Sequence, residues 1–345
     1  MKMHSRIQAE IDLDAMTYNL EHIKKNLAPK TQVIAVLKAD GYGHGAVPLA
    51  RRIQKDPEIW GIAVATVEEG EELRNAGITK PILILGYTYQ EDYQKIAKLD
   101  FRPAVFKLSM AKELSKAALE AGKTLKIHIK IDTGMTRIGY RDVKKDVPEI
   151  LEISKLPGLD IEGIFTHFAR ADEADKTPAL VQYEKFQEFI RALEQEGLHI
   201  PMKHCSNSAG IIRMQEANLD AVRAGIILYG LYPSKEVERE PVPLKPLMSL
   251  RSHIAYIKTV EPGAEISYGG IFTTVRETRV ATIPVGYADG LDRHLSCGKG
   301  SFMVNGHRVP TIGNICMDMT MLDVTGDVDA DAIAAIDGVV KVRVL

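Results

Sequence analysis

The stretch Gln32–Gly45 reads QVIAVLKADGYGHG. Its first half is a short, mostly apolar run that ends in Lys38, and its second half is a turn rich in glycine. A run that is apolar nearly throughout, instead of alternating with polar residues, is typical of a parallel strand covered on both faces. The segment therefore predicts a buried strand whose carboxyl end carries an amine.

Seven further apolar runs follow, with helix-like stretches between them. The runs are Trp60–Thr66, Pro81–Gly86, Phe101–Phe106, Leu125–Thr133, Asp160–Phe168, His199–Ser208 and Ala221–Gly230. Stretches with the 3.6-residue spacing of amphipathic helices include Val67–Ala76, Ser109–Ala121 and Thr177–Glu196. Eight strands with helical crossovers predict an α/β fold, a TIM-like (β/α)₈ barrel over residues 14–240, with an open doubly wound sheet as the alternative.

The pattern changes after Pro241, where helix signals nearly vanish. Four runs rich in β-branched residues predict strands, namely Ser252–Val260, Thr278–Val285, Ser301–Val309 and Met319–Val324. Within the third run, Asn305-Gly306 is a strong signal for a two-residue hairpin turn. We therefore expect a mostly-β domain over residues 241–345, joined by an N-terminal strand at residues 6–13.

Charge and cysteine content exclude several classes of protein. The 345 residues include 44 Lys and Arg against 46 Asp and Glu, a net charge of −2, whereas nucleic acid or an anionic membrane requires a basic excess. No run of 18 apolar residues or secretory signal is present. Cys205, Cys297 and Cys316 are not spaced as metal ligands. We expect a cytoplasmic protein with no metal ion, no structural disulfide, and neither nucleic acid nor membrane as partner.

Polar groups interrupt the predicted strands at the end where a barrel of this kind carries its chemistry. They are Lys38, Lys130, His167, the segment His204–Gly210, and Arg223. A lysine that ends an apolar strand favours the neutral amine needed for Schiff-base chemistry, although such a lysine alone can also extend from the rim into water. Hydroxyl and backbone donors after strands seven and eight suit a phosphate group. The convergence predicts one polar site.

Seven stretches also resemble the signatures of a known family. They read AVLKADGYGHGA, KIDTGMTRIG, SNSAG, VRAGIILYG, ISYGG, VGYADG and GNICMDM, in that order. The family is alanine racemase, a group of fold-type III enzymes that depend on pyridoxal 5'-phosphate (PLP). The resemblance covers nearly the whole chain and implies interconversion of L-alanine and D-alanine, the latter a precursor of cell-wall peptidoglycan.

The resemblance also implies roles for the residues that match. Lys38 would bind PLP covalently and act as one of two bases, and Arg223 would face the pyridine nitrogen. Tyr268 would be the second base, hydrogen-bonded to His167 and supplied by the other subunit, so a complete site implies a homodimer. The residues implied to hold the cofactor phosphate or to anchor its loop are Tyr42, Asn207, Ser208, Gly225 and Ile226.

The remaining implied roles concern the substrate. Arg137 would pair with the substrate carboxylate, which the Met317 backbone amide would also meet. Lys130 matches a lysine that carries a carbamate in many relatives, and its negative charge would hold Arg137 in place. Tyr287 would lie in the entry channel and restrict substrate size, and Asp318 would lie near its mouth.

Three other functions compete with this reading. A non-enzymatic PLP carrier shares the lysine-bearing barrel but lacks the β domain. A fold-type III decarboxylase has both domains but is expected to carry a glycine cluster and a Cys-Asp pair that this chain lacks. A racemase for serine or for a larger or basic amino acid is the nearest rival, because it can keep the same catalytic set.

One feature departs from the resemblance. Family members usually carry a longer tail with a tyrosine near the phosphate, whereas this sequence has no tyrosine after Tyr287. The alternation of Val340, Val342 and Val344 with basic residues predicts a closing, half-exposed strand. Either the β domain is shortened, or segments are absent from this sequence. If the shortening is genuine, the phosphate loses one hydroxyl donor, and we expect weaker retention of PLP than in long-tailed relatives.

Overall fold

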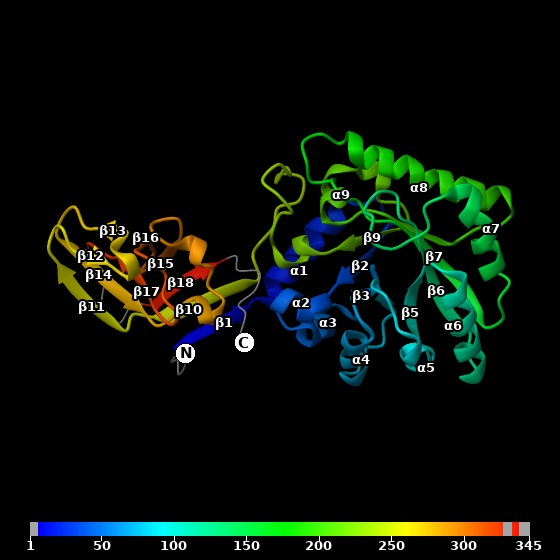
Figure 1. Ribbon diagram of the computed structural model, residues 1–345, viewed down its shortest axis with the longest axis horizontal. Helices are drawn as coiled ribbons and strands as arrows, with labels where there is room; N and C mark the ends of the chain where they lie inside the picture. The colour runs from blue at the N-terminus through cyan, green and yellow to red at the C-terminus, as the bar shows by residue number, and fades with distance from the viewer. Residues whose placement is uncertain (1–5, 327–332, 338–345) are drawn as a thin grey trace. The chain divides into compact units, whose positions relative to one another are not determined.

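The computed structural model describes residues 6–326 and 333–337 (Figure 1). The chain divides into two compact units. One unit spans residues 13–245, and the other combines residues 1–12 with residues 246–345.

The first unit is built on eight parallel strands. They are β2 (Gln32–Val36), β3 (Ile59–Val64), β4 (Ile82–Ile84), β5 (Phe101–Val105), β6 (Leu125–Lys130), β7 (Leu159–Phe165), β8 (Met202–His204) and β9 (Ala221–Ala224). Each strand from β2 to β7 pairs with the next, and β9 pairs with β2. Between β8 and β9 the ring is completed by backbone hydrogen bonds from Asp220 to Lys203 (3.2 Å) and from Arg223 to Ser206 (3.0 Å). The sheet is therefore a nearly closed barrel.

Helices connect these strands and surround the barrel (Figure 1). They are α1 (Leu13–Lys25), α2 (Lys38–Gly43), α3 (Ala46–Ile53), α4 (Val67–Asn75), α5 (Tyr93–Lys98), α6 (Leu108–Glu120), α7 (Val143–Ile153), α8 (Thr177–Gln195) and α9 (Ser208–Arg213). Helix α4 begins where the Thr66 side chain accepts a hydrogen bond from the Glu69 backbone, an N-cap that satisfies a free amide. On α1, Met16, Leu20 and Ile23 form the buried stripe that faces the barrel.

The predicted barrel is confirmed, although several of its strands are shorter than the predicted runs, among them the last. The run Ala221–Gly230 was expected to be a single strand, but β9 ends at Ala224 and a 3₁₀ helix, η3 (Ile226–Tyr229), follows. The backbone leaves the strand at Gly225, where φ is −105° and ψ is −109°. Tyr229 is buried inside the unit, where its hydroxyl donates to the Val36 carbonyl at 2.8 Å. The apolar character of this segment therefore predicted its burial correctly but not its conformation.

The second unit is a mostly antiparallel β structure. Its strands are β1 (Ile7–Ile11), β10 (Met248–His253), β11 (Tyr256–Val260), β12 (Glu265–Ile266), β13 (Phe272–Thr273), β14 (Thr278–Ile283), β15 (Ser301–Val304), β16 (His307–Ile312), β17 (Thr320–Asp323) and β18 (Ile333–Asp337). Eight of them form one sheet in the order β1-β10-β18-β15-β16-β17-β14-β11, and β12 pairs with β13. Buried Leu250, Ile283, Phe302 and Leu322 lie in its core.

One predicted strand of this unit is wrong. Ser252–Val260 was expected to be continuous, but it is interrupted between β10 and β11. The two halves have different neighbours, because β10 pairs with β1 and β18 whereas β11 pairs with β14. A change of pairing partner requires the chain to leave the ladder between them. The strand predicted around Val340, Val342 and Val344 lies outside the described residues.

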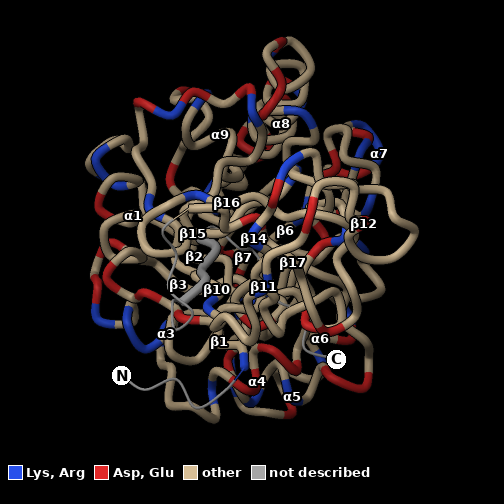
Figure 2. The backbone as a smooth tube through the Cα atoms, turned by 90° about the vertical axis from the view of Figure 1, so that its left-hand side faces the viewer, with Lys and Arg blue, Asp and Glu red and all other residues tan. Residues whose placement is uncertain are grey.

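The surface of the described chain carries both charge signs. Positions of Lys and Arg and positions of Asp and Glu are interspersed along the backbone (Figure 2). This mixture agrees with the net charge of −2. In residues 6–326 and 333–337, no helix has the length and apolar character needed to span a membrane.

The hairpin between β15 and β16 confirms the turn predicted at Asn305-Gly306. Both turn residues have positive φ, 48° at Asn305 and 79° at Gly306, which is the conformation of a type I′ turn. No atom lies within 4 Å of the position that a Gly306 side chain would take. Any cost of adding a methyl group there must come from the backbone conformation alone.

We predict that Gly306→Ala lowers the free energy of unfolding by about 1 kcal/mol, the cost of a left-handed alanine. Gly306→Asn is the matched control and should lose less, because asparagine tolerates this conformation. Urea denaturation of the two variants measures the difference. Equal losses in both would contradict the explanation.

Candidate active site

A cavity of about 540 Å³ opens among the residues that follow the barrel strands. Ten residues predicted for the site line it: Lys38, Tyr42, Lys130, Arg137, His167, Asn207, Ser208, Arg223, Gly225 and Ile226. They come from segments as far apart in sequence as α2 and η3. The barrel therefore brings together two amines, two guanidinium groups, an imidazole and two hydroxyls.

The segment after β2 has an unusual backbone. Ala39, Asp40, Gly41 and Tyr42 all have φ between 51° and 60°, so helix α2 is in fact a left-handed turn. Residues other than glycine adopt this region at a cost of roughly 1–2 kcal/mol each. Such strain persists only where the surrounding structure enforces it, and it concentrates at functional sites.

Two carboxylates hold this turn. Glu69 accepts hydrogen bonds from the backbone amides of Ala39 and Ala65, both at 2.7 Å. Asp40 accepts one from the Ala46 amide, also at 2.7 Å. The turn places Lys38 and Tyr42 on the same cavity.

A cradle of hydroxyl groups lies beside Gly225. The Gly225 amide donates to Ser208 Oγ at 3.1 Å. A Cβ atom on Gly225 would lie 3.2 Å from Tyr42 Oη and 3.5 Å from Ser208 Oγ, so the missing side chain leaves room between two hydroxyls. The Asn207 side chain stabilises the loop itself, accepting from the Gly210 amide and donating to the Phe168 carbonyl, both at 3.1 Å. The cradle can receive a small anionic group.

Arg223 is a buried cation with 3% of its surface exposed. Nη1 donates to His204 through Nδ1 (2.8 Å) and the carbonyl (3.0 Å). Nη2 contacts the carbonyls of Thr166 (2.7 Å) and Cys205 (2.9 Å) and His167 Nδ1 (3.3 Å). Among the described residues none of these partners is a carboxylate, and Nε takes part in none of these bonds. Burial and the nearby Arg137 lower the pKa of Arg223 to about 10, which still leaves it charged at neutral pH.

Lys130 lies in the same cationic surroundings. Its Nζ donates to the Ile131 carbonyl at 2.6 Å and lies 5.3 Å from the Phe165 ring. Burial and the charge of Arg223 lower the pKa of Lys130 to about 7, with a smaller effect from Arg137. A substantial fraction of this amine is therefore neutral, and hence nucleophilic, near pH 7.

His167 is neutral for similar reasons. Burial, followed by the charges of Arg223 and Arg137, holds its pKa well below the ordinary value of 6.5. Because an arginine only donates hydrogen bonds, the contact from Arg223 makes Nδ1 the acceptor and leaves the proton on Nε2. The imidazole can thus offer an N–H on the side away from Arg223.

The other four predicted site residues belong to the β unit. Tyr268 is 73% exposed, and its carbonyl accepts a hydrogen bond of 2.7 Å from the Asn314 side chain. The backbone of Gly286–Gly290 meets the neighbouring loop, since the Tyr287 amide donates to Cys316 (3.1 Å) and the Ala288 amide to Met317 (3.0 Å). Tyr268, Tyr287 and Met317 thus come from loops of one unit that are tied to the segment 314–319, which also contains Asp318.

Three polar residues of the barrel unit were not predicted for the site: His128, which is buried, and Glu162 and Glu69, which are partly buried. His128 and Glu162 were present within predicted strands, and a histidine in the otherwise apolar stretch IHIKI was the available signal. Glu69 gave no signal, because a glutamate in the first turn of a helix is ordinary.

Comparison with known proteins agrees with this geometry. The family of alanine racemase N-terminal domains matches residues 11–233, and that of C-terminal domains matches residues 247–342. An alanine racemase of Methanococcus maripaludis is 46% identical over 319 residues, which cover 92% of this chain and 85% of the relative.

Solved structures show the same similarity. An alanine racemase of Clostridium difficile superposes with a TM-score of 0.88 at 41% identity, covering 98% of this chain and 87% of that one. A histidine racemase of Leuconostoc mesenteroides has a TM-score of 0.85 at 26% identity, covering 97% and 89%. The barrel, the β unit and both family matches together show that this chain belongs to the alanine racemase family.

Proposed function

We propose that the chain is a PLP-dependent racemase that interconverts L-alanine and D-alanine in a homodimer, with Lys38 and Tyr268 of the partner subunit as the two bases. The observation that carries the proposal is the single cavity in which Lys38, Arg223 and the hydroxyl cradle beside Gly225 meet.

The residues of the cavity fit PLP. The cradle formed by Tyr42, Ser208 and Gly225 offers hydroxyl and backbone donors to a phosphate, in a space that a side chain at Gly225 would fill. The Lys38 amine can form a covalent bond to the carbonyl carbon of the cofactor. Arg223 has its terminal nitrogens occupied and would donate to the ring nitrogen through Nε.

PLP, when bound, supplies an electron-withdrawing ring that acidifies the Cα–H of an attached amino acid. Because Arg223 can only donate, it would favour a ring nitrogen without a proton and so keep this withdrawal weak. Weak withdrawal makes well-placed bases on both faces of Cα more important and limits side reactions such as transamination.

The two bases act on opposite faces of Cα. One removes the proton from Cα, and the protonated form of the other delivers a proton to the opposite face. In the reverse direction Lys38 and Tyr268 exchange roles. The reaction moves only protons and inverts one stereocentre.

His167 and Arg223 support the tyrosine base. A tyrosine accepts a proton near neutral pH only where its surroundings favour the phenolate. The neutral His167, with its proton on Nε2, can donate to a phenolate oxygen, and the nearby guanidinium of Arg223 adds a favourable positive charge.

The substrate carboxylate would bind Arg137, with the Met317 backbone amide as a second donor. A guanidinium suits a carboxylate because it can form two parallel hydrogen bonds. Tyr287 and Asp318 of the β unit would narrow the access channel and select a small amino acid.

The exposed apolar surface of the β unit supports a homodimer. Tyr268, Ile271, Met317 and Met319 are each at least half exposed. A cluster of large apolar side chains on a protein surface marks an interaction site. A partner barrel bound there would receive Tyr268.

In the cell, we place the reaction in the cytoplasm, as a source of D-alanine for peptidoglycan.

We predict that the protein supplied with PLP is yellow and racemises alanine faster than serine, lysine, ornithine or histidine. Lys38→Ala should lower the alanine rate at least about a hundredfold, since general acid–base catalysis contributes 10²–10⁴-fold, and its PLP should leave on dialysis. Lys25→Ala, on the exposed face of α1, is the control. Retention of colour and activity by Lys38→Ala would refute the assignment.

A second prediction concerns assembly. Homodimers of Lys38→Ala and of Tyr268→Phe should each be nearly inactive. Random subunit exchange between equal amounts should restore about a quarter of wild-type activity, because half of the dimers become mixed and each mixed dimer has one complete site. Exchange without recovery would show that the two bases do not come from different subunits.

A third prediction follows from Lys130. Its pKa falls from 10.5 to about 7 on folding. Between pH 7 and pH 10.5, Lys130 therefore carries a proton in the unfolded chain that it lacks in the native chain. In buffer free of carbon dioxide, the free energy of unfolding relative to Lys130→Met should therefore rise with pH by roughly 1 kcal/mol per unit.

Bicarbonate should extend this rise to lower pH. The neutral amine can react with carbon dioxide to form a carbamate and release a proton, and two guanidinium groups face it. Bicarbonate should then add the mass of one carbon dioxide to the native protein, and the free energy of unfolding should also rise with pH below 7, because the carbamylated native chain lacks the proton that the unfolded amine holds. Unchanged mass and slope would mean that Lys130 acts as a free amine.

A further inference from the structure

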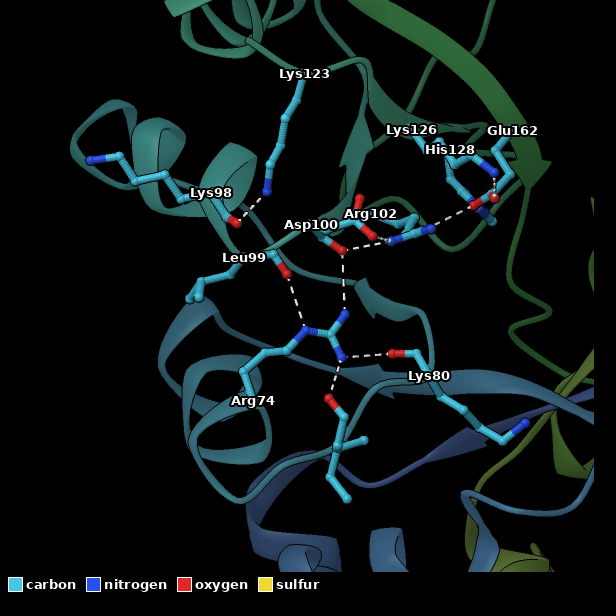
Figure 3. Close-up of polar contacts among 11 residues, drawn as sticks. Arg74, Lys80, Lys98, Leu99, Asp100, Arg102, Lys123, Lys126, His128 and Glu162 are labelled. Atoms are coloured by element: carbon cyan, nitrogen blue, oxygen red, sulfur yellow. Dashed lines mark hydrogen bonds and ion pairs between the residues drawn. The ribbon is translucent and has the colours of Figure 1, made fainter. Parts of the chain in front are cut away.

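A row of hydrogen-bonded polar side chains, which we call the file, runs from Arg223 through the barrel interior to Glu162. Arg223 Nη1 contacts His204 Nδ1 at 2.8 Å, His204 Nε2 contacts His128 Nδ1 at 3.0 Å, and His128 Nε2 contacts Glu162 Oε2 at 3.3 Å. The two histidines are fully buried. The four residues come from β9, β8, β6 and β7, and Figure 3 shows the end of the file at His128 and Glu162.

The direction of every hydrogen bond in this file follows from its two ends. Arg223 can only donate, so its bond to His204 exists only while Nδ1 accepts and the His204 proton lies on Nε2. His204 then donates to His128 Nδ1, and the proton of His128 lies on Nε2, facing Glu162. An ionised carboxylate can only accept, so the series is consistent with two neutral imidazoles. Burial holds the pKa of both histidines below the ordinary value, which agrees with neutrality.

Glu162 is held ionised by its other neighbours. Lys126 Nζ lies 3.0 Å from Oε1, and Arg102 Nε lies 3.3 Å from Oε2 (Figure 3). Burial alone would raise the pKa of Glu162, but hydrogen bonds from His128 and Lys126 and the charge of Arg102 outweigh it and lower the pKa to about 2. Arg102 is itself anchored by Asp100, through the carbonyl (2.6 Å) and the carboxylate (2.7 Å).

Packing leaves the two imidazoles little freedom to turn. The His204 ring stacks on Phe165 at 4.8 Å with an interplanar angle of 5°. A Cβ atom on Gly163 would lie 2.5 Å from His128 Nδ1, so β7 accommodates the ring only because residue 163 is glycine. With the rings held in place, a change at one end of the file must be met by a change of tautomer.

We propose that Glu162 is a positioning residue for Arg223, acting through His128 and His204 to fix one tautomer of each ring and one orientation of the guanidinium. Without an acceptor at its end, His128 can move its proton to Nδ1, where it faces the N–H of His204. If His204 then moves its own proton to Nδ1 to relieve this contact, Arg223 would face an N–H in place of an acceptor. The consequence for PLP rests on the function proposed above for Arg223.

The test compares Glu162→Leu, which removes the acceptor, with Glu162→Gln, which keeps an acceptor oxygen but removes the charge. Nitrogen-15 NMR of histidine-labelled protein without PLP reports the tautomers directly. We expect pure Nε2–H forms of His128 and His204 in the wild type and in Glu162→Gln, and a loss of these forms in Glu162→Leu. Titration with PLP should show a Kd about tenfold higher for Glu162→Leu, the size of one weakened hydrogen bond to a charged group.

Two further variants separate this role from general stability. Lys126→Met breaks a different contact of Glu162 and should leave the tautomers and the Kd unchanged. His128→Leu cuts the file from within, and it should remove the Nε2–H form of His204 and raise the Kd even where Glu162→Leu fails to fold.

Wild-type tautomers and affinity in both Glu162→Leu and His128→Leu would overturn the proposal. Equal losses in Glu162→Gln and Glu162→Leu would overturn the acceptor role. The tautomers are measured without PLP, so they test the file even where the wild-type protein fails to racemise alanine, an outcome that would refute the proposed function alone.

Discussion

The buried guanidinium of Arg223 is the constraint on which the rest of the site depends. Burying a cation is costly unless its donors are satisfied, and here carbonyl oxygens and imidazole nitrogens satisfy the terminal nitrogens. The same contacts require an unprotonated Nδ1 on His167 and on His204. Because no carboxylate contacts Arg223 among the described residues, its positive charge acts on the cavity and adds to the effect of burial, which lowers the pKa of Lys130 and His167.

The left-handed turn after β2 is a second energetically unfavourable feature near the cavity. Ala39, Asp40 and Tyr42 adopt a conformation that each would avoid in an isolated peptide. Glu69 compensates by binding the amides at the ends of β2 and β3 together. The proposed covalent residue and a proposed phosphate donor therefore lie on a segment whose geometry comes from tertiary contacts, which makes it rigid where positioning matters.

The division of proposed roles between the two units has a chemical rationale. The barrel unit carries the groups that would hold a cofactor, and the β unit carries exposed Tyr268 and Met317. If the second base comes from a partner subunit, the site is complete only after assembly. Assembly would then bury apolar side chains that are exposed on the single chain, so the same surface would contribute both to association and to chemistry.

Sequence alone determined the elements whose signals are local. Apolar runs located the eight barrel strands, Asn305-Gly306 located a hairpin turn, and polar residues at strand ends indicated one site, because burial, turn chemistry and strand direction are encoded by near neighbours. The tertiary structure decided the rest. The left-handed turn depends on Glu69, 30 residues beyond Ala39, and the break within Ser252–Val260 depends on which strands pair with each half. The file from Arg223 to Glu162 exists because closure of the barrel brings four strands around one interior, a proximity that no local pattern records.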